Sequence, residues 1–509
     1  MEFENDLTRK ILDPIHGIIR LTNLEMAVID HPLFQRLRNI KQNSFLYKVF
    51  PSAVHSRFEH SLGVLHLSYE IIENLRLNAI RYNNKYQDGH VFCYINEIPS
   101  CHIQELRLAA LLHDVGHGPM SHQFESFMPT KNELKSFLKN KHHEIFNLIE
   151  KDDTPVEHEH ISLIFASMIF ADINKEKNLL GNINTENVLK IIEKEYGDRK
   201  ISCKIGKNEI DLLPLLTSII SSCPIDADRM DYLLRDSYFS GVKSGIYDYN
   251  RLFMSIVPVE SEGKLFLAYK ESGIDSVVEF IGARSSLFSQ IYFHKTNRSI
   301  SSMLNKLCEN MKSTAQKNLI IDELRTKKAS GQNPEHLMSD FYLDCSDDHF
   351  LNEKLGLWID KTNNISSNKK ILNDIIERRP WSKVFEKKYY VKNVTINDTT
   401  SKELIASIKD ELNKLVNSHF NKDQFCIDIQ TDVAFKDIQK TEVKLLVKNL
   451  NNSYTAKRLD ECGYKLNQYQ TIHYIIRVFI DRNATNFSYF KESLPSEINA
   501  IVENYLPMK

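Results

Sequence analysis

The sequence predicts a mainly α-helical protein, with a helical core in residues 1–310 and a smaller mixed α+β part in residues 311–509. Three observations predict this class. Apolar residues recur at three- and four-residue steps over long stretches, which is the period of an amphipathic helix. The 509 residues include only 16 glycines and 14 prolines, too few to separate many short strands. Strand-like alternation becomes evident only after roughly residue 250.

The elements follow in chain order from these patterns. In residues 60–80, side chains such as Leu62, Leu65 and Ile72 share one face of an expected helix. Other apolar runs predict buried helices at residues 106–112, 161–173 and 209–222, and strands at 264–269, 387–396 and 472–481. Stretches rich in Lys and Asn are expected to be surface insertions or mobile connections, near residues 130–155, 172–210 and 325–370.

Composition bounds the function classes. The formal net charge of -2 indicates no global attraction to nucleic acid or to an anionic membrane, although 65 Lys and Arg leave room for a local basic groove. The polar N-terminus does not look like a signal peptide, and the apolar run in residues 212–222 is too short to span a bilayer. The eight cysteines are scattered, with no C-x-x-C pair, as is typical of reduced thiols. These features predict a cytoplasmic protein that does not enter a membrane.

The stretch LRLAALLHDVGHGPMSHQFE, residues 106–125, places a His-Asp pair at the end of a buried helix. Burying His113 and Asp114 is costly unless both have partners, and a divalent metal ion accepts an imidazole nitrogen and a carboxylate oxygen together. Gly116, Gly118 and Pro119 supply the turn that lets adjacent side chains converge. The bland alternative is a His-Asp hydrogen bond at the end of a core helix.

Two other segments favour the metal. Upstream, HSRFEHSLGVLH places His60 at the start of the helix expected in residues 60–80. Downstream, IDADRMDYLLRDSYFSGV alternates apolar positions with several aspartates, among them Asp228. One His, a His-Asp pair and a distant Asp together furnish a four-ligand site of nitrogen and oxygen donors.

At this point the sequence resembles a known family, the deoxynucleoside triphosphate triphosphohydrolases of the SAM-and-HD-domain type. Six motifs occur in that family's order: LDPIHGIIRL, HPLFQRLRNIKQ, FPSAVHSRFEHSLGV, LLHDVGHGPMSH, HEHIS and IDADRMDYLLRDSYFSGV. The resemblance runs from about residue 10 to about residue 300 and then fades. No SAM domain precedes the core, as in bacterial relatives.

The resemblance implies an enzyme that hydrolyses deoxynucleoside triphosphates to deoxynucleosides and tripolyphosphate. It implies one divalent ion per site, Mg, Mn, Fe or Zn, with further Mg bound to the nucleotide. The implied metal ligands are His60, His113, Asp114 and Asp228. The implied catalytic residues are His117, Glu125 and His158, with Glu125 orienting His117.

A triphosphate also requires cationic side chains and a face for its sugar. The resemblance assigns substrate contacts to Arg57, Arg229, Tyr232, Asp236, Arg284, Tyr292 and Lys295. A ring of Tyr232 packed under C2′ would exclude a ribose 2′-hydroxyl and select deoxynucleotides. Phe288 stands where some relatives carry a His, so the base and sugar contacts are expected to differ from theirs.

The segment DHPLFQRLR suggests regulation by a second nucleotide. In the family this segment contributes to an activator pocket that neighbouring subunits complete. Asp30, Gln35 and Arg38 carry suitable groups for guanine, because a carboxylate accepts from N1–H and N2–H while an Arg donates to O6 or N7. Leu12 replaces a polar residue found in some activated relatives. The resemblance implies a homo-oligomer, a tetramer or larger even assembly, that an activating or inhibitory nucleotide controls.

Other functions stay open from the sequence. One alternative is another HD phosphohydrolase, such as a nucleotidase, an alarmone hydrolase or a cyclic-dinucleotide phosphodiesterase. The second is a nucleotide-sensing or single-strand nucleic-acid-binding module without turnover. A third possibility concerns the biological role: a bacterial triphosphohydrolase of this type would deplete deoxynucleotides during phage infection, with a partner or second messenger controlling it through residues 311–509.

Overall fold

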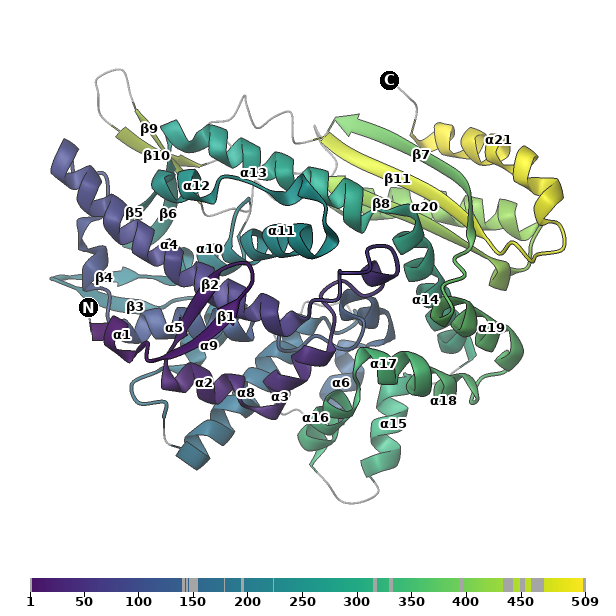
Figure 1. Ribbon diagram of the computed structural model, residues 1–509, viewed down its shortest axis with the longest axis horizontal. Helices are drawn as coiled ribbons and strands as arrows, with labels where there is room; N and C mark the ends of the chain where they lie inside the picture. Colours follow the sequence, from purple (N-terminus) through teal and green to yellow (C-terminus); the bar gives the residue numbers. More distant parts are fainter. Residues whose placement is uncertain are drawn as a thin grey trace.

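The computed structural model describes residues 2–139, 142, 145, 154–177, 179–193, 196–222, 224–314, 318–328, 333–392, 398–433, 443–448, 454–458 and 471–506. Figure 1 shows a large helical body and a smaller sheet with helices beside it. The predicted class, mainly α with a mixed α+β C-terminal part, is confirmed. Within the described part of the chain, no helix is both long and apolar enough to cross a bilayer.

The helical body is built first along the chain. Its helices are α1 (Glu2–Asp6), α2 (Asn23–Ile29), α3 (Pro32–Gln35), α4 (Arg57–Tyr86), α5 (Ser100–Leu112), α6 (Lys131–Phe137), α8 (His158–Lys177), α9 (Thr185–Ile192), α10 (Leu213–Ile220), α11 (Ala227–Ser240), α12 (Tyr249–Ser255), α13 (Ile274–Leu287), α14 (Lys295–Thr314), α15 (Leu319–Lys328), α16 (Pro334–Asp344), α17 (Asp347–His349), α18 (Leu355–Ile359) and α19 (Ile365–Ile376). Shorter turns used below are the 3₁₀ helices η1 (Arg36–Asn39) and η4 (Ser121–Phe127) and the π-helix η7 (Phe288–Tyr292).

Three sheets accompany these helices. The strands are β1 (Arg9–Asp13), β2 (Gly17–Leu21), β3 (Ser202–Ile205), β4 (Asn208–Asp211), β5 (Ile256–Ser261), β6 (Lys264–Lys270), β7 (Ser382–Lys392), β8 (Phe425–Val433), β9 (Lys444–Lys448), β10 (Tyr454–Arg458) and β11 (Thr471–Ile480). β1 and β2 form a hairpin, the second sheet has the order β10-β9-β6-β4-β3 with β5 beside β6, and the third has the order β7-β11-β8. Helices α20 (Asp398–Asn417) and α21 (Phe487–Tyr505) accompany the third sheet.

Helix α4 is a long helix of the body and begins with a capping box. The side chain of Ser56 and the carboxylate of Glu59 satisfy each other's backbone N–H groups at the first turn. Leu65 and Ile72 have no exposed surface, and α4 packs against both α5 and α11. Three helices that carry the expected metal ligands are therefore neighbours.

The turn after α5 is held in an unusual backbone conformation. Leu106 to Leu112 lie fully or almost fully inside the core, and the helix ends there, with His113 as its cap. Further on, Met120 and Ser121 adopt left-handed φ values of 61° and 53°. Residues with a Cβ seldom adopt this conformation, so contacts from other segments must hold it.

The predicted boundary at residue 310 falls inside α14. One hydrophobic core continues from Phe3 through to Trp381 and also takes in Cys426, Leu445 and Phe479, and a second begins at Phe385 on β7 and includes residues of α20 and α21. The C-terminal layer therefore consists of β7, α20, β8, β11 and α21, whereas β9 and β10 join the sheet of the main body through β6. Sequence periodicity cannot locate the boundary between the two cores, because an amphipathic helix has the same pattern whichever core it packs against.

Two of the Lys/Asn-rich stretches are not surface insertions. Helix α9, inside residues 172–210, packs against α5, and Val188 and Ile191 have no exposed surface. Helices α16 to α18, inside residues 325–370, bury Phe341 and Trp358. Their few apolar side chains lie on one face, which overall composition conceals. Part of the stretch near 130–155 lies outside the described residues.

The β1–β2 hairpin was also not predicted, because little strand-like alternation was expected before residue 250. Asp13, at the end of β1, accepts hydrogen bonds from the backbone N–H groups of Ile15 and His16, both at 2.9 Å. Gly17 follows with a φ of 72°. This tight turn places His16 against α11, close to the expected metal site.

Candidate metal centre and active site

The four expected metal ligands converge from three helices. His60 Nε2 lies 3.0 Å from Asp228 Oδ1 and 3.6 Å from Asp114 Oδ2. His113 Nε2 lies 3.5 Å from Asp114 Oδ1 and 4.0 Å from Asp228 Oδ1. The ligand atoms of His60, His113 and Asp114 all lie within 4.8 Å of one another. The arrangement therefore offers two imidazole nitrogens and two carboxylates to one ion.

Both imidazoles are oriented for this purpose. His60 Nδ1 contacts Asp231 Oδ2 at 2.8 Å, and His113 Nδ1 contacts the Ala110 carbonyl at 2.8 Å. A proton on each Nδ1 leaves the Nε2 lone pairs facing the site. Both Nε2 atoms are buried and have no hydrogen-bond partner among the described residues. Leaving a buried polar atom unpaired costs about 1–3 kcal/mol, so these residues fit a bound metal ion.

Charge favours a cation at the same place. Burial alone would raise the pKa of Asp114, but His113, Arg57 and His117 hold it well below the usual value. Burial also opposes charging of His60, yet the adjacent carboxylates of Asp228 and Asp231 raise its pKa to about 10. The carboxylates that stabilise a proton on His60 are the groups that would hold a metal ion in its place.

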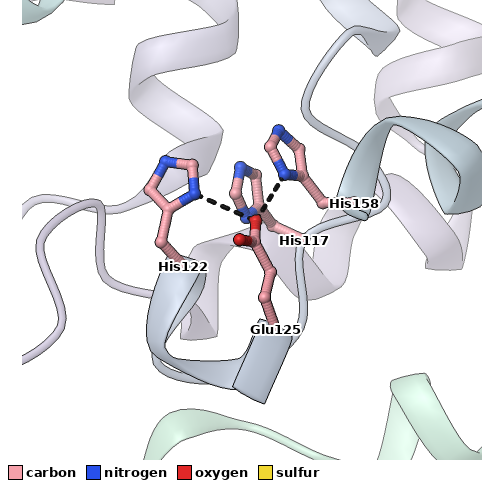
Figure 2. Close-up of side chains that lie close together, drawn as sticks. All are labelled: His117, His122, Glu125 and His158. Atoms are coloured by element: carbon pink, nitrogen blue, oxygen red, sulfur yellow. Dashed lines mark hydrogen bonds and ion pairs between the residues drawn. The ribbon is translucent and has the colours of Figure 1, made fainter. Parts of the chain in front are cut away.

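A second cluster of four side chains lies beside the metal ligands (Figure 2). The rings of His117 and His158 stack with centroids 3.6 Å apart. Glu125 Oε1 lies 2.8 Å from His158 Nδ1 and 3.0 Å from His122 Nδ1. Glu125 thus orients His158 and His122, whereas the sequence analysis expected it to orient His117. His117 Nε2 instead lies 3.4 Å from Asp114 Oδ1.

The two stacked imidazoles differ in basicity. Burial lowers the pKa of His117 well below its usual value, and the cations Arg57 and His158 lower it further. Burial also disfavours charge on His158, but neighbouring carboxylates, including Glu125, raise its pKa. Burial would raise the pKa of Glu125, but its hydrogen bonds to histidine lower it to about 2. The cluster therefore combines a neutral His117 with a His158–Glu125 ion pair.

A buried arginine fixes the backbone between the two clusters. Arg36, in η1, donates to the carbonyl of His117 at 2.7 Å and to that of Val115. Its guanidinium also lies 5.4 Å from the centroid of the Phe165 ring and 5.0 Å from that of Tyr342. Although burial lowers its pKa to about 10, Arg36 stays charged at neutral pH. It is a positioning residue that the sequence analysis did not assign.

An aspartate from far along the chain holds the left-handed turn. Asp347, in α17, accepts from the backbone N–H of Met120 at 2.6 Å and from that of Lys41 at 2.9 Å. Ser121 Oγ accepts from Arg57 Nε at 2.9 Å, which connects this turn to the arginine that contacts Asp114. The helices after residue 310 thus help to shape the site.

Asp347→Asn is expected to change how stability depends on pH. Burial raises the pKa of Asp347 to about 6, above the value of about 3.9 in an unfolded chain. Between these values the folded state binds more protons, so the free energy of unfolding falls as pH rises from about 4 to about 6. Asn does not titrate, so the variant should lose this dependence, by up to about 3 kcal/mol over the window. Thermal midpoints of both proteins between pH 4 and pH 7 measure the difference. The exposed neighbour provides the control: an Asp348→Asn variant with the same altered slope would contradict the assignment.

The residues expected at the sugar form a connected group. Asp236, on α11, accepts from the Tyr292 hydroxyl and contacts His55 Nε2 at 2.6 Å. The rings of Tyr232 and Tyr292 lie edge to face, with centroids 6.4 Å apart. His55, which was not among the residues predicted from the sequence, is thus part of this group.

The expected cationic residues are placed differently from one another. Arg57 contacts Asp114 directly, whereas Arg284 lies over the ring of Phe288, 4.2 Å from its centroid. Phe288 thus contacts a cation at the position where some relatives carry a His. Arg229 pairs with Asp226, the N-cap of α11, and this pair must open or be shared if Arg229 is to contact a phosphate. Lys295 is exposed at the start of α14.

The expected regulatory residues lie together near α2 and α3. Gln35 Nε2 donates to the Ile29 carbonyl at 2.7 Å, and its Oε1 accepts from Arg38 Nε at 2.8 Å. The Arg38 guanidinium lies 3.5 Å from the centroid of the Phe58 ring. Asp30 is exposed at the end of α2. Gln35 and Arg38 are therefore already paired with each other.

Asp231 is the main site residue that the sequence analysis missed. It is fully buried and contacts His60, His16 Nε2 at 2.7 Å and Arg235 Nε at 2.9 Å. Gly63 is required opposite it, because a Cβ there would come within 1.8 Å of Asp231 Oδ1. The available signal was spacing: three residues after Asp228 on α11, the next carboxylate lies directly behind the site.

Comparison with known proteins agrees with this geometry. Residues 57–236 match the family described as HD domain, and this range contains all four metal-ligand candidates. An uncharacterized protein of Methanocaldococcus jannaschii is 32% identical over 314 residues, which are 62% of this chain and 52% of that protein. The deoxynucleoside triphosphate triphosphohydrolase SAMHD1 homolog of Dictyostelium discoideum is 31% identical over 317 residues, 60% of this chain and 51% of that one. Human deoxynucleoside triphosphate triphosphohydrolase SAMHD1 is 29% identical over 308 residues, 59% and 44% of the two chains.

The chain spans about half the length of the curated relatives that it matches. The matched part contains both clusters described above, and the deoxynucleoside triphosphate triphosphohydrolases are among its relatives. Residues 57–236 therefore match the HD domain, and about 60% of the chain is similar to deoxynucleoside triphosphate triphosphohydrolases of the SAMHD1 type.

Proposed function

We propose that the protein hydrolyses deoxynucleoside triphosphates to deoxynucleosides and tripolyphosphate in a metal-dependent reaction. One observation carries the proposal: two imidazole Nε2 atoms and two carboxylates converge beside the stacked His117–His158 pair. The relatives named for this activity support the choice of substrate.

His60, His113, Asp114 and Asp228 would hold the divalent ion, Mg, Mn, Fe or Zn. When bound, such an ion supplies Lewis acidity toward a phosphoryl oxygen and toward water. Arg57 stands next to Asp114 and is the first cation available to the phosphates. Further positive charge would come from Arg284, Lys295 and, once its pair with Asp226 opens, Arg229.

The proton chemistry falls to the second cluster. Water attacks the α-phosphorus and releases a proton to the solvent, the bond from that phosphorus to the sugar 5′-oxygen breaks, and the departing oxygen takes up a proton. His117 lies nearest to the metal ligands and is the residue placed to deliver it. A bound polyphosphate would neutralise the cations around His117, which favours its protonated form. Glu125 and His158 fix the plane against which the His117 ring stacks.

The test is incubation of the full-length protein with each of the four deoxynucleoside triphosphates and Mg²⁺ or Mn²⁺. Anion-exchange separation of the products should show intact tripolyphosphate and free deoxynucleoside. Release of orthophosphate or pyrophosphate instead would identify another kind of HD phosphohydrolase. Binding without any turnover would favour the nucleotide-sensing alternative.

Sugar selection should depend on Tyr232. If its ring packs beneath C2′, GTP should be hydrolysed much more slowly than dGTP, and Tyr232→Ala should reduce that difference. Initial rates with both nucleotides measure the ratio. Tyr238→Ala is a matched control, because this exposed tyrosine lies on the same helix, α11. A wild-type protein that cleaves GTP as fast as dGTP would contradict the assignment.

Regulation, assembly and biological role stay predictions. We propose that Asp30, Gln35 and Arg38 contribute to a nucleotide-responsive site in a homo-oligomer, and that the enzyme depletes deoxynucleotides during phage infection. Their exposed or half-buried positions support access to a ligand or a second subunit. Single-stranded nucleic acid is a further predicted partner.

A further inference from the structure

A large polar cavity lies between the helical body and the C-terminal layer. Its volume is about 670 Å³, within the range of about 300–1,000 Å³ usual for small-molecule sites. Its walls are α14 from the body, α20 and β8 from the C-terminal layer, and Ser126 at the end of η4. Figure 1 shows α14 close to β8 and α20. None of the expected active-site or regulatory residues lines it.

The lining is rich in cations. Arg298, Lys306, Lys312 and Lys409 contribute four positive side chains, against the two carboxylates of Glu309 and Asp428. Lys306 Nζ and Lys409 Nζ, from different layers, each lie 3.6 Å from a carboxylate oxygen of Glu309. One carboxylate therefore serves two ammonium groups, and Arg298 is held by Asp428 at 2.7 Å. The excess positive charge suits a ligand with several negative charges.

Amide side chains complete the cavity. Asn413 and Asn417 on α20 and Gln430 on β8 line it beside the lysines. The two asparagine amides carry both donors and an acceptor, which is the pattern that the edge of a nucleobase requires, whereas Gln430 Nε2 already donates to Asp428 Oδ1 at 2.9 Å and leaves its Oε1 as an acceptor. Cations for phosphates and amides for a base point to a nucleotide.

The cavity also adjoins η4, the segment that carries Glu125. Ser126 follows Glu125 directly in η4, and its hydroxyl donates to Asn305 Oδ1 at 3.2 Å. Cys308 Sγ contacts the Ser126 carbonyl at 3.0 Å. Asn305 and Cys308 both lie on α14 and line the cavity. A ligand that moves α14 relative to η4 would therefore shift Glu125, which orients His158 and His122.

We propose that this cavity binds a nucleoside polyphosphate and that binding is communicated to the active site through η4. The binding step stands independently of the proposed function. The coupling rests on the proposed active site, but backbone hydrogen exchange measures the coupling without any turnover.

The experiment is calorimetric titration of the full-length protein with ATP, GTP, inorganic tripolyphosphate and a single-stranded oligonucleotide, at one ionic strength. ATP or GTP should bind to the wild type. The double variant Lys306→Gln/Lys409→Gln should bind the same nucleotide roughly tenfold or more weakly, because two charge-assisted contacts are lost. Lys414→Gln is the matched control, because Lys414 lies on α20 outside the cavity lining and should leave the affinity unchanged. Unchanged thermal midpoints verify that the variants fold.

Hydrogen exchange then tests the coupling. Addition of the bound nucleotide should slow exchange in residues 121–127 of the wild type and not in the double variant. Binding that the double variant retains in full would overturn the site. Tighter binding of tripolyphosphate than of either nucleotide, or lysine-dependent binding of the oligonucleotide alone, would overturn the assignment to a nucleotide. Nucleotide binding that leaves exchange in residues 121–127 unchanged would overturn the coupling.

Discussion

Asp114→Ala is expected to abolish hydrolysis and to remove the bound metal. Among the described residues, Asp114 is the carboxylate that lies close to His60, His113, His117 and Arg57 at once, so its loss removes a ligand and the negative charge that balances these groups. The wild type should contain about one ion per chain, as expected for a four-ligand site. Elemental analysis of the purified protein, together with the tripolyphosphate assay, measures both effects and identifies the ion.

Two further variants make this result specific. Asp114→Asn keeps the size of the side chain and an acceptor for Arg57, so a loss of metal in both variants assigns the effect to the charge. Asp172→Ala, at a carboxylate that is half exposed on α8, should keep metal and activity. Equal metal content and equal turnover in wild type and Asp114→Ala would remove the metal site from the proposed mechanism.

The second large effect is expected at His117. His117→Ala should slow turnover by roughly 10²–10⁴-fold, the usual contribution of a positioned proton donor, while metal content and nucleotide affinity stay near those of the wild type. Single-turnover rates at saturating substrate, beside equilibrium binding, separate the two contributions. A His117→Ala variant that loses binding but turns over bound substrate normally would make His117 a binding residue.

His349→Ala serves as the control for that experiment. His349 is partly exposed on α17 and contacts Glu353 at 3.4 Å, so its removal should change neither rate nor binding. A comparable loss of rate in His349→Ala would show that replacing a histidine in the helical body lowers activity without any specific role for that residue.

The positions of the metal-ligand candidates could be predicted because their signals are local. Burying His113 and Asp114 at the end of a Leu- and Ala-rich helix costs free energy unless both side chains have partners. A few consecutive residues are enough to recognise this cost. The amphipathic period around His60 and the aspartates around Asp228 are equally local. These segments are also the ones that the family resemblance covers.

The partners of these residues could not be predicted in the same way. Asp231 was visible in its motif, but its role depends on α4 and α11 packing closely at Gly63. Glu125 was expected to orient His117, yet the path of η4 directs its carboxylate to His158 and His122. A sequence shows which groups are available, whereas hydrogen-bond partners depend on distances of a few tenths of an ångström.

The sequence by itself determined the helical class of this protein, the residue types of its candidate metal site and the match of residues 57–236 to the HD domain. Only the tertiary structure decided that Asp347 and Arg36 hold the turn between α5 and η4, that the main core continues past residue 310, and that a cationic cavity forms next to η4. The physical reason is sequence distance. Helical periodicity and turn chemistry act between near neighbours, whereas these contacts join segments up to hundreds of residues apart, which meet only once the helices pack.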